Sequence, residues 1–167
     1  GNWCNHSYFD EPIPLEDEQC AAREKKFHFK DPLARIAVAY HSVPSSHELA
    51  PAFDVLSLIL GGNESSRLPR KLERETRLSV GINSSHLSSN FCGILFASAE
   101  AEHSNLNELR NVIHREFREL VENNPPSENE VKRAATQISA DFLKSLRSID
   151  AIASLVGNSV LLYQDPN

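Results

Sequence analysis

Several residue types that carry specialised chemistry are scarce or absent in this chain. Its 167 residues include no methionine, one tryptophan, three cysteines and six glycines. No apolar run approaches the roughly 18 residues of a membrane-spanning helix, so the sequence predicts no membrane span. The net charge of −6 argues against non-specific nucleic-acid binding, because phosphates repel an acidic surface. Because even an initiator Met is missing, we expect the chain to be an excised part of a longer protein.

The cysteines do not form the close pairs that zinc fingers and zinc ribbons require. Cys92 lies in an apolar segment, and we expect it to be a small core residue. Cys4 and Cys20 flank a loop and can pair in an oxidising compartment. Free thiols are favoured, because a domain of this size does not depend on a disulfide.

Histidine is the residue type that most invites a search for a metal site. A helical zinc site places two histidines on one helix face with a glutamate beside them, and no histidine pair here has that spacing on a predicted helix. We therefore expect surface and strand-edge histidines and no metal ligand in this chain. The histidines are His6, His28, His41, His47, His86, His103 and His114.

Hydrophobic periodicity predicts an α+β fold, with helices on one face of a mainly antiparallel sheet, because strands and helices do not alternate strictly. The predicted strands cover residues 24–30, 36–41, 78–83 and 91–99. The predicted helices run from Ala50 to Leu60, from Ser65 or Ser66 past Leu72, from Ser104 past Leu120, from Ser127 to Leu146, and from Ser148 to Tyr163.

Several residues have the character of helix ends. Gly61-Gly62 is expected to end the first helix in the left-handed conformation, and Ser104 is expected to cap the third. Ser127 with Glu130 is a capping box, which opens the long fourth helix.

Two predicted helices carry apolar residues at helical spacing, and we expect these residues to face the core. In the long helix they are Val131, Ala135, Ile138, Phe142 and Leu146, and in the last helix they are Ile152, Leu155 and Val156.

Three further patterns invite a functional interpretation. Gly61-Gly62 lacks the Lys-Ser/Thr of a P-loop and follows a helix, so it is not a phosphate loop. The serines near His41 and His47, which are Ser42, Ser45 and Ser46, lack a nucleophile-elbow pattern, so turn and capping roles are expected for them. A basic run from Arg67 to Arg77, interleaved with glutamates, is typical of a solvated helix face, with a weak role in holding acidic substrate segments as the alternative.

The domain organisation follows from the acidic, proline-containing start of the chain. We predict that residues 1–22 are the end of a preceding domain and a linker, and that residues 23–167 form one domain that is incomplete at its C-terminus.

From Ala39 to Asn167 the chain resembles the C-terminal-type inactive domain of the insulinase/pitrilysin family of zinc metallopeptidases, which includes the mitochondrial processing peptidase. The matching pieces occur in family order, and the upstream SYFDEPIP resembles the end of the preceding domain. The pieces are AFDVLSLILGG, SSRL, LERETRLSV, FASAEAE, NEVKRAATQISADFLKSLRS and DAIASLVGNSVLL.

The resemblance also implies which residues face the substrate. The inverted zinc motif H-x-x-E-H belongs to the preceding domain and is absent here. Where the family carries an Arg and a Tyr seven residues apart, this chain has Glu73 and Val80. Gly61 and Gly62 match the loop that lies near substrate in processing peptidases. We therefore expect no catalytic or metal residue here, and substrate contact at Gly61, Gly62, Glu73 and Val80.

The function that the resemblance implies is that of a non-catalytic domain in a zinc metalloendopeptidase. It would form part of a peptide-binding chamber, with zinc supplied by another domain or chain and the full-length chains forming dimers. The alternative is a structural, proteolytically inactive subunit. The implied compartment is the bacterial periplasm or cytoplasm, with the mitochondrial matrix as the alternative.

Overall fold

The computed structural model describes residues 19–163, and the chain divides into two units, Gly1–Lys30 and Asp31–Asn167. Residues 19–30 of the first unit contain no helix or strand, so the strand predicted over 24–30 is wrong. Phe27 and Phe29 stay largely exposed, because an alternating pattern makes a stable strand only where a neighbouring strand pairs with it. Cys4 and most of the predicted linker 1–22 lie outside the described residues.

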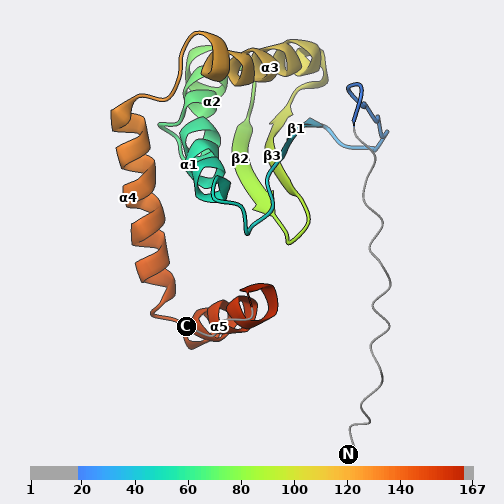
Figure 1. Cartoon of the computed structure of the whole chain (residues 1–167). Helices are drawn as coiled ribbons and strands as arrows, with labels where there is room; N and C mark the ends of the chain where they lie inside the picture. The colour runs from blue at the N-terminus through green and yellow to red at the C-terminus, as the bar shows by residue number, and fades with distance from the viewer. Residues whose placement is uncertain (1–18, 164–167) are drawn as a thin grey trace, which may run out of the picture. The chain divides into compact units, whose positions relative to one another are not determined.

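The second unit is built on an antiparallel sheet in the order β1-β3-β2, drawn in Figure 1. Its strands are β1 (Ala34–Ser42), β2 (Gly81–Ser88) and β3 (Gly93–Ala101). Strand β2 begins later than the predicted 78–83. The reason is that the amides of Leu78 and Ser79 both donate to the carbonyl oxygen of Leu72, which closes the preceding helical turn.

Helices cover one face of this sheet, which confirms the α+β prediction. Helix α1 packs on β2 and β3, and α3 packs on β1 and β3. No helix among residues 19–163 is long and apolar enough to cross a membrane. The helical elements are α1 (Ala50–Gly61), α2 (Arg67–Pro69), the π-helical turn η1 (Arg70–Glu75), the 3-10 turn η2 (His103–Asn105), α3 (Leu106–Glu122), α4 (Glu128–Ser145) and α5 (Ile149–Tyr163).

The core lies between β3 and the helices. Alternate β3 residues from Leu95 to Ala101 are buried, as the two-residue period of a strand requires. Leu60 of α1 joins Leu109 and Ile113 of α3 there, all fully buried. The opposite face of the sheet carries Ile94, which is partly exposed.

The Gly61-Gly62 break has a different cause from the one predicted. Gly62 has φ −75°, and none of the described glycines is left-handed. A Cβ on Gly61 would lie 2.6 Å from the Ser84 nitrogen, and one on Gly62 would lie 2.3 Å from Leu58 Cδ2. Glycine is needed here for close packing. The left-handed residue is Arg77, with φ 53°.

The helix starts are confirmed in part. The capping box at Ser127 and Glu130 is present, with Ser127 Oγ accepting from the Glu130 amide. Asn105, and not Ser104, occupies the N-cap position of α3. Ser66 precedes α2, but its hydroxyl donates to the Leu58 carbonyl oxygen, so it ties α2 back to α1.

The predicted burial of the last two helices is wrong. In α4 the buried residue is Ala134, whereas Phe142 is 49% exposed. Cys92 is exposed too, because it precedes β3 and lies in the turn after β2. The other apolar residues of these two helices that were predicted to be buried are exposed or only half-buried, because few described residues pack on them. They are Val131, Ala135, Ile138, Leu146, Ile152, Leu155 and Val156.

Candidate functional site

Three of the four positions expected to face substrate lie together around the first half of β2. Glu73 Oε1 accepts a hydrogen bond of 2.9 Å from the Ile82 amide, and Gly61 packs against Ser84. Val80 donates its amide to the Glu100 carbonyl oxygen at 2.9 Å and leaves its side chain 65% exposed. Gly62, the fourth position, packs against Leu58 instead.

The outer edge of β2 can be assigned from its hairpin. The Ser89 amide donates to the Cys92 carbonyl oxygen, so odd-numbered residues of β2 direct their amides toward β3. Even-numbered residues therefore direct their amides outward. Glu73 occupies that of Ile82, and Gly61 packs against the Ser84 nitrogen. The amides of His86 and Ser88 remain, toward the hairpin end of the edge.

A Ser-His-Asp hydrogen-bond network crosses the helix-covered face of the sheet. Ser42 Oγ lies 2.9 Å from His86 Nε2, and His86 Nδ1 lies 2.7 Å from Asp54 Oδ1. Gly93 makes room for it, because a Cβ there would lie 2.3 Å from Ser42 Oγ. The His86 ring also stacks on Phe53 at 5.4 Å.

The order of these groups is that of a hydrolase triad, but their surroundings favour a structural role. The His86 side chain is 1% exposed, with the Phe53 ring stacked on it. The network therefore ties β1, β2 and α1 together. Sequence reasoning weighed Ser42 against the nearby His41 and His47. It missed His86, which lies 44 residues away, because no local spacing links them.

A second polar cluster joins α2 to α4. Arg67 donates from Nε to Glu130 Oε1 at 2.7 Å and from Nη2 to Glu130 Oε2 at 2.8 Å, and its Nη1 donates to the Asn124 carbonyl oxygen at 2.7 Å. The two hydrogen bonds from the Arg67 guanidinium lower the pKa of the Glu130 carboxyl to about 2. The same hydrogen bond raises the pKa of Arg67.

The basic run is therefore not a uniformly solvated face. Arg67 is buried, and Lys71 is ion-paired with Glu116 of α3. Arg70 and Arg74 do match the prediction, since both remain mostly exposed.

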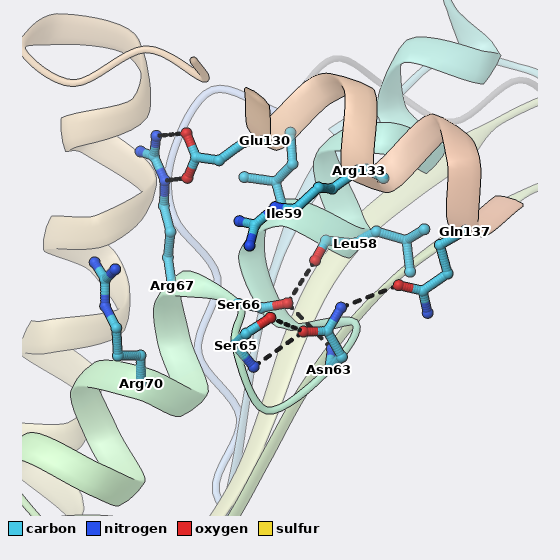
Figure 2. A pocket seen from close by; sticks show the side chains of 11 residues that line it. Leu58, Ile59, Asn63, Ser65, Ser66, Arg67, Arg70, Glu130, Arg133 and Gln137 are labelled. Carbon is cyan, nitrogen blue, oxygen red and sulfur yellow. Dashed lines mark hydrogen bonds and ion pairs between the residues drawn. The ribbon is translucent and has the colours of Figure 1, made fainter. Parts of the chain in front are cut away.

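A hollow of about 290 Å³ adjoins this cluster. Figure 2 shows Arg133 and Gln137 of α4 on one side and the turn after α1 on the other, with Asn63 Nδ2 donating to Gln137 Oε1 at 3.0 Å. Ser65, Ser66 and the Arg67–Glu130 pair complete its wall.

Within residues 19–163 no group of three or more His, Cys, Asp or Glu side chains could hold a metal ion. A catalytic zinc takes about three protein ligands, so the described residues do not fit zinc.

Comparisons with known proteins agree with this fold. The family profile described as "Peptidase M16 inactive domain" matches residues 6–138. A solved peptidase M16 inactive domain from Pseudomonas fluorescens is 16% identical with a TM-score of 0.63, and the match covers 69% of this chain and 28% of that one. The inactive peptidase domain of a putative zinc protease from Bordetella parapertussis is 15% identical with a TM-score of 0.67, covering 77% and 70%.

A chain of complex III2 from Candida albicans is also similar, at 22% identity and a TM-score of 0.70, with coverage of 81% of this chain and 34% of that one. This chain thus spans about a third of the length of that protein and of the Pseudomonas one. No curated protein matches the sequence significantly. Since the profile covers most of the sequence, the chain belongs to the peptidase M16 inactive domain family.

Proposed function

We propose that this chain is a non-catalytic domain of a zinc metalloendopeptidase and forms part of a chamber that binds extended peptides. The observation that carries the proposal is the family match over residues 6–138, joined to an edge strand, β2, with outward amides. Zinc and the general base would come from a preceding domain or a partner subunit, in full-length chains that dimerise.

Strand addition is the binding mode that this edge supports, because an extended peptide gains main-chain hydrogen bonds there. The carboxylate of Glu73 already holds the Ile82 amide, so pairing with a peptide would use the amides of His86 and Ser88. Val80 offers an apolar contact where the strand begins. Gly61 and Gly62 would shape the adjoining turn, and Gly61 itself is buried against Ser84.

The alternative is a structural subunit that keeps the fold without handling peptides. The similarity to a chain of complex III2 favours it. The two functions differ in one measurable property, which is whether the edge of β2 takes up a peptide.

The test is fluorescence anisotropy with a labelled, unstructured peptide and the same peptide N-methylated at every residue. We expect the first peptide to bind and the second to fail, because N-methylation removes the donors that pair with a strand edge. Ser88→Pro should weaken binding and Ser88→Ala should not, since proline removes the outward amide. Equal binding of both peptides would refute strand addition, and binding of neither would favour the structural subunit.

A further inference from the structure

The hollow beside α4 carries more positive charge than its own acidic residue can neutralise. Its wall includes Arg67, Arg70 and Arg133 and a single acidic side chain, Glu130. The whole chain, by contrast, has a net charge of −6. Positive charge is therefore concentrated at this place on an acidic protein.

Glu130 has little capacity left to neutralise the other two arginines. Its Oε1 accepts from Arg67 Nε, and its Oε2 accepts from Arg67 Nη2 and from both the amide and the hydroxyl of Ser127. A carboxylate has about four acceptor positions, and Glu130 is charged throughout the physiological range because its pKa is about 2. The Nε and Nη2 donors of Arg67 are correspondingly occupied by Glu130.

Arg70 and Arg133 are available to a ligand. Arg133 makes no hydrogen bond or ion pair in the part of the chain that the structure describes. Arg70 has one weak ion pair, 3.7 Å from Glu75, in which both side chains are mostly exposed. Figure 2 shows that they reach the hollow from different elements, Arg70 from η1 and Arg133 from α4.

A neutral donor lines the same hollow. Gln137 accepts from Asn63 through Oε1, which leaves its NH2 group to donate. Ser65 Oγ donates to Asn63 Oδ1 at 2.6 Å and holds that amide in place. Two guanidinium groups and an amide donor form a set suited to oxyanions, because arginine binds carboxylate and phosphate through paired hydrogen bonds.

We propose that this hollow, between the turn after α1 and the face of α4 that carries Arg133 and Gln137, binds an oxyanion group. A carboxylate of an acidic peptide and a phosphate share this chemistry. The proposal does not depend on strand addition at β2, because the hollow shares none of the residues at that edge.

The test is a calorimetric titration of the 167-residue chain at low ionic strength. Inorganic phosphate and an acetylated tetraglutamate peptide are used in separate titrations. We expect saturable binding of at least one ligand. Arg133→Gln and Arg70→Gln should each weaken it by about tenfold, since each removes a charge-assisted contact. Arg115→Gln is the matched control, because Arg115 is an exposed arginine of α3 outside the hollow.

The pattern of outcomes separates a site from general electrostatic attraction. Phosphate binding alone supports a small-oxyanion site, and peptide binding alone supports a carboxylate site. Binding of neither ligand, or an equal loss in Arg115→Gln, would overturn the proposal. Urea unfolding of each variant checks that the fold is retained, which we expect because Arg70 and Arg133 are exposed.

Discussion

Helices α3 and α4 differ sharply in what covers their apolar faces. In α3, Leu109 and Ile113 are fully buried against the sheet. In α4, Ala134 is buried where the helix meets α1, while Phe142 and Leu143 remain exposed. Both helices carry apolar residues at helical spacing. The difference therefore comes from the neighbours of each helix and not from its own pattern.

The sharpest test of this comparison truncates one residue from each helix. Leu109→Ala should lower the free energy of unfolding by about 3–4 kcal/mol, because it opens a cavity in a closed core. Phe142→Ala removes a larger side chain but should cost about 1 kcal/mol or less, because that side chain is half exposed. Urea unfolding measures both. Equal losses would show that another surface covers α4 in solution.

The second prediction concerns the pair that fastens α4 to α2. The pKa of Glu130 falls from 4.5 to about 2 on folding, so its ionised form is favoured in the folded state. The resulting stabilisation is fully present above about pH 4.5 and is lost as the pH falls through 2. Because the Glu130 side chain keeps part of its contact with solvent, this pairing stabilises the fold by on the order of 2 kcal/mol.

Urea unfolding between pH 5 and pH 2 measures this loss. Glu130→Gln should flatten that part of the stability profile. Glu128→Gln should leave it unchanged, since Glu128 is an exposed neighbour on the same helix. A full acid-induced loss that persists in Glu130→Gln would assign the effect to other carboxylates.

Helices α1 and α3 and strand β3 could be predicted from the sequence, because the residue patterns that indicate them are local. The apolar segment predicted as a strand over 91–99 overlaps most of β3 (Gly93–Ala101), and the helical spacing in α1 and α3 also depends on residues a few positions apart. The fold class followed from the order of such elements. The family resemblance supplied the positions Glu73 and Val80, which spacing alone would not have singled out.

The contacts of the polar clusters could not be predicted, because they join residues far apart in sequence. Arg67 and Glu130 are 63 positions apart, and Arg67 belongs to the same basic run as the exposed Arg70. Charge patterning therefore indicated a solvated face. The burial of Phe142 was predicted wrongly for the same reason: periodicity identifies an apolar face but not what covers it.

The third prediction is that the Ser-His-Asp network stabilises the packing of α1 on the sheet. In a double-mutant cycle, Asp54→Ala and His86→Ala should couple by about 1 kcal/mol, because each removes the same 2.7 Å contact. Asp54→Ala and His114→Ala should be additive, since His114 contacts Tyr40 on another element. Additivity of the first pair would mean that the network adds nothing to stability.

The smallest expected effect sharpens the comparison at the start of α4. Ser127→Ala removes the acceptor for the Glu130 amide and should cost about 0.5–1 kcal/mol. Because α4 has few buried contacts, its cap supplies a large share of its local stability, so amide exchange should quicken in the first turn of α4 and not in α3. Ser139→Ala is the control, because its hydroxyl donates back to the Ala135 carbonyl oxygen and contributes little to the helix. If exchange quickened equally in α3 and α4, the two helices would unfold as one unit, and the contrast between them would be one of exposure and not of stability.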